Sequence, residues 1–433
     1  MILRFRFRNF RSFRKEQELS LIASNLGDLP DVVRRPKGLS EGLLPVAAIY
    51  GANASGKSNV LMGLSFMEEA VRNSQRTWSP DKPIRVDPFL LAGEQDNTMT
   101  FEVDLLIEGV QYEYGFSLDS ERIHREWLNA YPSGRKQTWF SRDVGQPRVF
   151  KFGKQLSGEN RAIENLTRKN SLFLSAAAQN NHEQLLPIYN WFGDKLFFIS
   201  DRRPFQSLIQ LTAELCKDDT VRARVSSLLA AADLGIVGVD VSEEAPDENF
   251  AKFLQALRTA YSSTDAGPMF DGVDTRQPSL SVAWRHRGFG STEIPFRESQ
   301  ESAGTLIWFG LLGQVLHAIE DGSTLCVDEL DSSLHPLLAA EIVRYFNDPK
   351  RNSNGAQLIF NTHDTNLLDA TLLRRDQVWF VEKDRAGSSH LYPLTDFKPR
   401  RHENLERGYL QGRYGAIPFV GELNPAPESS DAQ

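Results

Sequence analysis

The chain has 433 residues, a formal net charge of −8 and 40% apolar residues. This composition is typical of a soluble protein with a sizeable core and, at this length, of two or three domains. The acidic balance argues against a surface that grips nucleic acid throughout, although it leaves a local basic patch open. Two cysteines, Cys216 and Cys326, are too few for a disulfide framework or a cysteine-based zinc site, so we expect a reducing, cytoplasmic setting.

The N-terminus, MILRFRFRNFRSF, has no apolar stretch of the kind found in a secretion signal, and no run of 18 apolar residues predicts a membrane span. Alternation of apolar residues with arginines predicts a strand with one apolar face, and a second strand follows by residue 23. These cations leave contact with nucleic acid open, and the alternative is a solvated or partner-facing row. The basic residues concerned are Arg4, Arg6, Arg8, Arg11, Arg14 and Lys15.

Further elements follow in chain order. A buried strand over 46–50 runs into a glycine-rich loop, and a helix is expected from about 58 to 76. Alternation predicts a hairpin over 98–118, after which loops are expected to about 160. A mainly helical stretch comes next, and the nucleotide motifs lie on either side of it. The remaining expected elements are strands at 279–296, 324–328, 357–361 and 378–382, an apolar helix at 304–319, and a disordered tail after 422.

Residues Gly51–Ser58, GANASGKS, satisfy the pattern G-x-x-x-x-G-K-[ST]. The preceding strand and the following helix are the context this loop needs, because backbone N–H groups and the positive helix end hold the phosphates. Lys57 is expected to neutralise β/γ-phosphate charge, and the Ser58 hydroxyl to ligate Mg²⁺. The sequence therefore predicts ATP and Mg²⁺ as ligands. The binding residues expected in this segment are Gly51, Asn53, Ala54, Ser55, Gly56, Lys57, Ser58 and Asn59.

A second apolar strand ends in two carboxylates, Asp328 and Glu329. We expect Asp328 to complete the Mg²⁺ shell together with Ser58, and Glu329 to polarise the attacking water. Lys57 and Asp328 lie 271 residues apart in the sequence. One catalytic site must therefore be assembled from two distant halves of the chain.

The segment Ser302-Ala303-Gly304-Thr305 opens the apolar helix 26 residues before Asp328 and resembles the signature motif of ABC-type ATPases. The resemblance implies that Ser302 and Gly304 contact the γ-phosphate of ATP bound to the opposite subunit, whereas the alternative is an ordinary capped helix start. The run LDSSLHP after Glu329 resembles the D-loop and implies that Asp331 lies at the nucleotide. His363, at the end of a later strand, resembles the switch histidine of the same family.

The N-terminal NFRSF, residues 9–13, is similar to the opening of SMC- and RecF-like ATPases. That similarity implies that Arg11 approaches the phosphates, and the alternative is one more cation on an edge strand. Four segments, GANASGKSN, QLIFNTHDTNLLD, VWFVE and YLQGRYGAIP, carry a narrower likeness. With NFRSF they resemble the AAA15-type, RloA/AbiL-like ATPases of bacterial abortive-infection and restriction-associated loci. This implies a protein without a long coiled coil that works with a separately encoded effector.

These observations predict an α/β fold, an ABC-type P-loop ATPase head with an antiparallel β-region and a mainly helical insertion. The expected divisions are an ATPase lobe with the P-loop at 1–154, the insertion at 155–280, a second lobe at 281–420 and a disordered tail at 421–433. The active unit is expected to be a homodimer or higher homo-oligomer, because Ser302 cannot serve the site that Lys57 builds on its own chain.

The function expected from this fold is an ATP-hydrolysing switch that controls the effector of an anti-phage defence system, with no membrane involved. The alternative is a nucleic-acid-binding repair ATPase of the RecF-like kind. A nuclease of the Toprim type is set aside because no D-x-D pair follows Glu382. The N-terminal strand motif and long insertion also resemble SMC-like ATPases more than transporter ATPases.

Overall fold

The computed structural model describes residues 1–92, 97–200, 205–232, 235–244, 279–290, 292–332, 334–401 and 403–417. The predicted disordered tail and Gln95, a candidate for a glutamine loop, lie outside these residues. The chain divides into two compact units. The first comprises Met1–Ser200, Ala318–Ser332 and Ala339–Gln433, and the second comprises Asp201–His317 and Ser333–Leu338.

The first unit contains a seven-stranded antiparallel sheet in the order β2-β1-β4-β5-β6-β7-β8. The arginine–phenylalanine alternation of the N-terminus forms its β1 strand, with Phe5 and Phe7 buried on one face. The strands are β1 (Ile2–Arg8), β2 (Gln17–Ser20), β4 (Met99–Ile107), β5 (Val110–Leu118), β6 (Ile123–Tyr131), β7 (Gln137–Asp143) and β8 (Phe150–Phe152).

The loops expected between residues 118 and 160 are wrong, because β6, β7 and β8 occupy most of that stretch. Each of these strands pairs antiparallel with its neighbour in the sheet. The glycines and prolines that predicted loops lie outside the strands, in the turns at Pro132, Gly134, Gly145 and Pro147 and after β8 at Gly153 and Gly158. Cross-strand pairing therefore extends the sheet through residues whose local pattern is weak.

The same unit contains a six-stranded sheet in the order β16-β15-β3-β14-β13-β9. Neighbouring strands are parallel, except for the antiparallel edge pair β15–β16. One member, β9, lies inside the segment predicted to be a mainly helical insertion. Its apolar run LFFI forms a strand there because it pairs with β13. The strands are β3 (Val46–Tyr50), β9 (Leu196–Ile199), β13 (Thr324–Val327), β14 (Gln357–Asn361), β15 (Val378–Lys383) and β16 (Ser389–Pro393).

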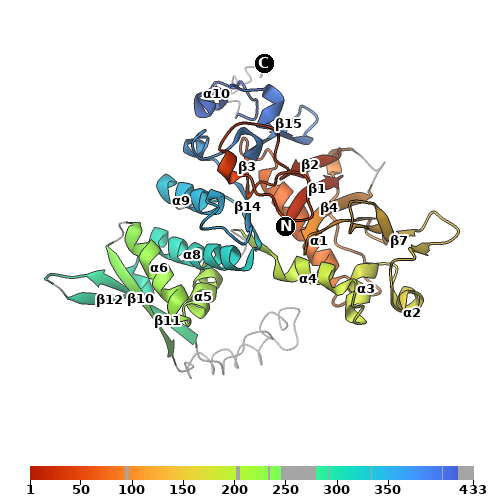
Figure 1. Cartoon of the computed structure of the whole chain (residues 1–433), viewed down its shortest axis with the longest axis horizontal. Helices are drawn as coiled ribbons and strands as arrows, with labels where there is room; N and C mark the ends of the chain where they lie inside the picture. Colours follow the sequence, from red (N-terminus) through yellow and green to blue (C-terminus); the bar gives the residue numbers. More distant parts are fainter. Residues whose placement is uncertain are drawn as a thin grey trace, which may run out of the picture. The chain divides into compact units, whose positions relative to one another are not determined.

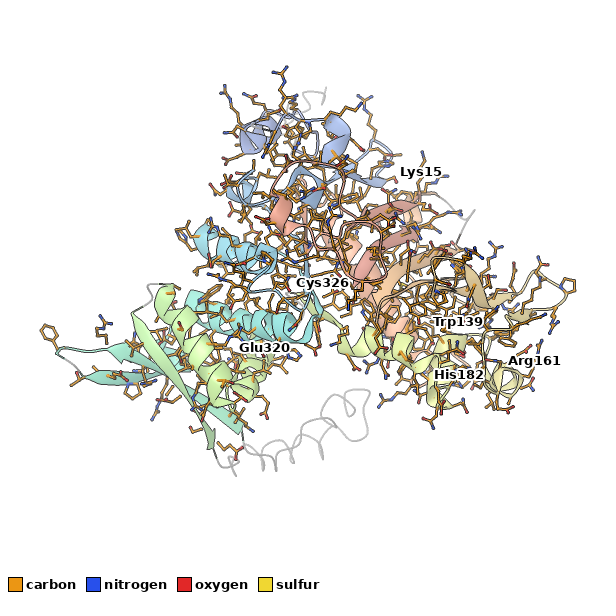
Figure 2. The ribbon with its side chains drawn as sticks, viewed as in Figure 1. Lys15, Trp139, Arg161, His182, Glu320 and Cys326 are labelled. Atoms are coloured by element: carbon orange, nitrogen blue, oxygen red, sulfur yellow. The ribbon has the colours of Figure 1, made fainter. Side chains whose placement is uncertain are left out.

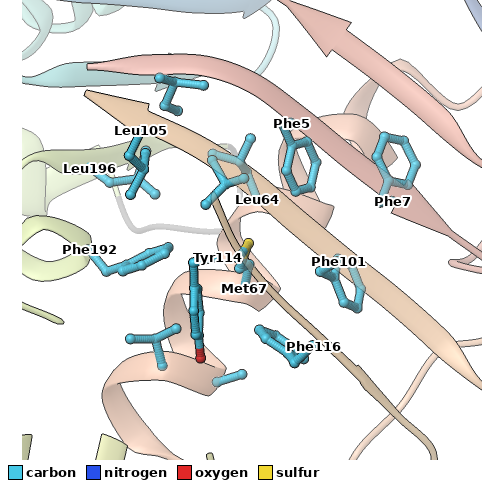
Figure 3. Close-up of a cluster of buried hydrophobic side chains, with 14 of the residues drawn as sticks. Phe5, Phe7, Leu64, Met67, Phe101, Leu105, Tyr114, Phe116, Phe192 and Leu196 are labelled. Carbon is cyan, nitrogen blue, oxygen red and sulfur yellow. The ribbon is translucent and has the colours of Figure 1, made fainter. Parts of the chain in front are cut away.

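Helix α1 (Lys57–Asn73) contributes buried side chains to a hydrophobic cluster that also contains residues of both sheets. Its Leu64 and Met67 lie among aromatic side chains of the antiparallel sheet, as Figure 3 shows. Gly63 faces the Phe5 ring so closely that an added Cβ would lie 3.3 Å from it. The other helices wholly in this unit are α2 (Asn160–Leu166), α3 (Phe173–Gln179), α4 (Leu186–Asp194) and α10 (Leu405–Leu410).

Cys326, labelled in Figure 2, is buried in β13. Burial raises the pKa of its thiol far above the ordinary value. The side chain therefore acts as a small core residue, as its apolar neighbours predict.

The second unit contains an antiparallel sheet of β10 (Ile236–Glu244), β11 (Ser279–Arg287) and β12 (Glu293–Arg297). Helices α5 (Phe205–Leu215) and α6 (Asp219–Ala231) pack on this sheet (Figure 1). The Thr212 hydroxyl donates to the Gly310 carbonyl at 2.9 Å and joins α5 to α8 (Ala303–Asp321). This unit begins at Asp201, whereas the predicted insertion begins at 155, because helices α2–α4 and strand β9 belong to the first unit.

Two helices extend from one unit into the other along the chain, α8 (Ala303–Asp321) and α9 (Pro336–Asn347). Among the described residues, α8 alone is long and apolar enough to cross a membrane, and 61% of its apolar window is buried within the structure. A core helix passes the same test of length and composition.

Candidate nucleotide-binding site

The predicted motifs meet at the carboxyl edge of the parallel sheet. Strand β3 ends at Tyr50 before the P-loop, β13 ends before Asp328, and β14 ends before His363. Since β3, β14 and β13 are consecutive and parallel in the sheet, their carboxyl ends lie at one edge. This pairing brings together the two halves of the site that are far apart in the sequence.

Two serines that lie outside the P-loop in the sequence, Ser12 and Ser389, pack against this loop. Gly56 has φ 112°, and a Cβ there would lie 2.5 Å from Ser12 Oγ and 2.7 Å from Ser389 Oγ. The Ser389 hydroxyl donates to the Ser55 carbonyl, and Asn59 Nδ2 donates to Ser12 Oγ at 2.8 Å. Glycine is required at position 56 by this close approach. Sequence reasoning missed both serines, although Ser12 lies within the NFRSF motif.

The side chain of Lys57 folds back onto the P-loop, of which Lys57 is itself a part. Its ammonium donates to the carbonyls of Gly51 at 3.0 Å and Ala52 at 3.1 Å, and the residue is 6% exposed. Burial lowers the pKa of Lys57 to about 8, and this decrease is opposed by Glu329, Asp331 and Asp328. Those carboxylates therefore lie close enough to the ammonium to act on its charge.

Two features of the loop fit a phosphate ligand. Ser55 Oγ is buried and has no hydrogen-bond partner within the described part of the chain. The ammonium of Lys57 is partly desolvated, which makes an anionic ligand a better partner than neutral carbonyls. The neighbouring hydroxyl of Ser58 and carboxylate of Asp328 supply the oxygen ligands that Mg²⁺ prefers.

Asn361, the last residue of β14, connects this strand to the two acidic residues that follow β13, Asp328 and Glu329. It is fully buried, its Nδ2 donates to Asp328 Oδ1, and its Oδ1 accepts from the Glu329 backbone at 2.6 Å. Glu329 has φ 55°, an uncommon conformation for a residue with a side chain. The amide of Asn361 thus holds both the orientation of Asp328 and the strained backbone of Glu329. Sequence reasoning gave this residue no role.

The D-loop and switch segments are also bonded to each other. Asp331 Oδ1 accepts from the Thr362 hydroxyl at 2.6 Å, and both its carboxylate oxygens accept from the His363 backbone at 3.3 Å. The His363 side chain is exposed. Partial desolvation lowers the pKa of His363, and the positive charge of Lys57 lowers it further. His363 is therefore biased toward the neutral imidazole in this arrangement.

The C-terminal segment packs against the same edge. The Thr365 hydroxyl donates to Glu406 of α10 at 2.9 Å. The Tyr409 ring lies 6.0 Å from the Tyr50 ring and stacks on Phe380 at 5.5 Å. Residues 409–417 of the predicted YLQGRYGAIP motif therefore support the strands beneath the site, and Pro418 lies outside the described residues.

The remaining predicted residues lie in the P-loop and at the start of α8. Asn53 and Ala54 are exposed at the top of the P-loop, where Ala54 has φ 59°. Ser302 is exposed in the second unit, and its Oγ accepts from the Thr305 backbone at 3.1 Å, the geometry of a helix cap. Gly304 follows in the first turn of α8. The role of Ser302 and Gly304 at a nucleotide remains a prediction.

Three of the N-terminal arginines form ion pairs with acidic residues. Arg4 lies 3.4 Å from Asp104, and Arg6 Nε donates to Glu102 at 2.6 Å. The Arg11 guanidinium pairs with Asp87 at 2.7 Å. A contact of Arg11 with phosphate would require exchange of that partner. Arg4 and Arg6 would likewise have to leave their acidic partners to contact a phosphate, and the role of this row stays a prediction.

Comparison with known proteins identifies a family and several similar solved structures, of which two are described below. Residues 46–369, about three quarters of the chain, match the family described as "AAA domain, putative AbiEii toxin, Type IV TA system". No curated protein matches the sequence.

Two solved structures share a low overall similarity with the chain. One is an Smc head bound to the C-terminal winged-helix domain of ScpA, with 13% identity and TM-score 0.44, covering 90% of this chain and 96% of that one. The other is an Smc head with an extended coiled coil bound to the C-terminal domain of ScpA derived from Pyrococcus furiosus. Its identity is 12% and its TM-score 0.38, and the match covers 90% of this chain and 95% of that one.

The depressed pKa of Lys57 predicts proton uptake on nucleotide binding. A bound phosphate should restore the lysine to its charged form, so the affinity for MgATP should fall as pH rises through the value of about 8. Between pH 7 and pH 9 the loss should be about tenfold. Calorimetry in buffers of different ionisation enthalpy measures the uptake directly. Lys57→Arg is the control, because its guanidinium stays charged, and equal uptake by both proteins would contradict the assignment.

Proposed function

The chain belongs to the family of AAA domains described as a putative AbiEii toxin of a type IV toxin–antitoxin system, and on that premise we propose that it is an ATP-hydrolysing switch that controls a separate effector in anti-phage defence. The likeness of sequence segments such as QLIFNTHDTNLLD to RloA/AbiL-type ATPases also supports the defence role. The proposal is carried by one observation, the convergence of Lys57, Asp328 and Glu329 at the carboxyl edge of the parallel sheet.

Each of these groups has one task in the proposed reaction. Lys57 leaves the carbonyls of Gly51 and Ala52 and neutralises phosphate charge. Ser58 and Asp328 would hold Mg²⁺, which would supply charge neutralisation at the transferring phosphoryl group. Glu329 orients and deprotonates the attacking water, and Asn361 keeps that carboxylate's backbone in place. His363, neutral and exposed, can sense the γ-phosphate through a ring nitrogen.

Completion of the site by a second copy is part of the proposal. Ser302 caps α8 through its Oγ and is exposed, so the start of that helix can present backbone N–H groups to an anion. Two heads arranged head to tail would each supply this helix end to the other's P-loop. ATP would then hold the two heads together, and hydrolysis would release them.

The first test concerns hydrolysis. Glu329→Gln should retain MgATP binding and lower kcat at least about 100-fold, because the amide cannot act as a base. The variant should accumulate as an ATP-bound dimer, which size-exclusion chromatography with light scattering would detect. Glu341→Gln is the matched control, because Glu341 is a half-buried carboxylate on α9 that forms ion pairs with Arg344 and Arg351. An ATP-saturated Glu329→Gln protein that stays monomeric at micromolar concentrations would contradict assembly on ATP.

The composite site has its own test. Ser302→Arg should lose hydrolysis while keeping nucleotide binding, and Lys57→Ala should lose both. A verified heterodimer of the two variants should recover up to half of the parental rate, since one of its two interfaces keeps both an intact P-loop and an intact signature helix. Absence of recovery would show that each site is completed within one chain.

We place the contact with the effector on the β11–β12 hairpin of the second unit. Phe289, in the turn between β11 and β12, is fully exposed, and Ile294 nearby on β12 is 47% exposed. Exposed apolar side chains placed together mark interaction surfaces. This hairpin carries none of the predicted nucleotide residues, so it can bind an effector while the heads open and close.

The effector role is tested in cells under phage challenge. Protection should require the chain together with the product of its neighbouring gene, and Lys57→Ala should abolish it. Phe289→Ser should also abolish protection while the purified protein keeps its ATPase rate, because the hairpin is needed for the partner only. Full protection by the ATPase alone, or nucleic-acid cleavage by the purified chain, would exclude this function.

A further inference from the structure

A groove of about 450 Å³ lies on the antiparallel sheet at strands β6–β8, where the sequence predicted loops. Its lining includes Arg125, Trp127, Ser141, Arg148 and Lys151. None of these residues belongs to the predicted nucleotide motifs. The nucleotide motifs therefore do not account for the groove.

Cross-strand register places an aromatic ring in this groove. Gly115, Trp127, Ser141 and Lys151 are consecutive partners across β5, β6, β7 and β8, so they share one face of the sheet. A Cβ on Gly115 would lie 2.4 Å from the Trp127 ring, which shows that the indole lies over the glycine backbone. Its Nε1 donates to Glu102 at 3.0 Å, and the residue is half-buried. The indole is thus fixed over the sheet with part of its surface accessible.

Positive charge surrounds this ring. Arg125 is 65% exposed and has one ion pair, with Asp143 at 3.2 Å. Arg148 and Lys151 are exposed and have no ion-pair partner in the part of the chain that the structure describes. This contrasts with Arg4 and Arg6 on the same sheet, which are paired with acids of the neighbouring strand.

The carboxylates at the groove already have hydrogen-bond or ion-pair partners within the protein. Glu126 is fully buried, and its carboxylate accepts from the backbones of Phe173 and Leu174 at 2.6 and 3.0 Å. Arg142 lies beneath the groove, 5% exposed, and donates to the Ser171 carbonyl at 2.7 Å. Asp143 is bound by Arg125. Arg142 and Glu126 are buried and offset each other's charge, and Glu102 beside Trp127 is paired with Arg6. The exposed Arg125, Arg148 and Lys151 therefore outnumber Asp143, and the groove has a net positive charge within an acidic protein.

We propose that this groove is a second nucleotide-binding site, where a base stacks on Trp127 and phosphates contact Arg125, Arg148 and Lys151. A flat aromatic ring beside exposed cations matches both parts of a nucleotide, whereas an acidic peptide would use the cations and leave the ring without a partner. The ligand is either a free nucleotide or a segment of single-stranded nucleic acid. The site is separate from the P-loop and does not depend on hydrolysis.

The test uses the full chain with Lys57→Ala, which removes the main phosphate contact of the P-loop. Fluorescence anisotropy with a labelled twelve-nucleotide dT strand gives the affinity. Arg148→Glu combined with Lys151→Glu should weaken binding at least tenfold and reduce the slope of log K against log salt by about 1.4. The matched control is Arg35→Glu combined with Lys37→Glu, an equal change of charge at exposed residues elsewhere.

Trp127→Leu should weaken binding at least about fivefold with an unchanged salt slope, and Trp127→Phe should restore most of the affinity. Displacement of the strand by AMP or ATP at similar concentrations would identify a free nucleotide as the ligand, and displacement by unlabelled strand alone would identify nucleic acid. The proposal is overturned by any of three results. These are equal affinity of the groove variant and its control, equal binding of an abasic strand, or equal competition by poly-glutamate.

Discussion

Parallel pairing of β3, β14 and β13 is the constraint on which the nucleotide site depends. These strands come from positions 46–50, 357–361 and 324–327, and their pairing aligns three separate loops at one edge. The central strand is fully buried. Its last residue, Asn361, hydrogen-bonds to both carboxylate positions that follow β13. A shift of one residue in the β13–β14 register would turn Asn361 to the other face and separate the P-loop from its acids.

The sequence alone predicted the α/β fold class and the elements that carry motifs, because each has a strong local pattern. The apolar run before the P-loop and the alternation over 98–118 are examples, and the structure confirms both as β3 and as β4 with β5. Strand β9 has only four residues in a helical region, so its place beside β13 depends on long-range pairing. Strands β6–β8 were missed because charged and polar residues fill their exposed face and reduce the apolar signal.

The same contrast between local sequence pattern and long-range contacts applies to the residues of the candidate site. The residues Lys57, Asp328 and Glu329 could be named from spacing because the chemistry needs those groups beside a loop or at a strand end. The supporting residues could not be named, since their partners lie far away in the sequence. Ser389 is 334 residues from the Ser55 carbonyl that it binds, and Asn361 is 32 residues from Glu329. A polar residue at the end of a fully buried strand, as in QLIFN, was the one local signal for Asn361.

Lys57 shows how the fold prepares this edge for an anion. The ammonium is buried, and two neutral carbonyls are its hydrogen-bond acceptors. Three nearby carboxylates offset part of the cost of burying it, but burial still lowers its pKa to about 8. A phosphate replaces weak neutral acceptors with full negative charge, so a ligand gains more from this lysine than from an exposed one. The same carboxylates would repel that phosphate unless a divalent cation stood between them, which explains why the loop that binds the anion ends in Ser58, a hydroxyl suited to a metal ion.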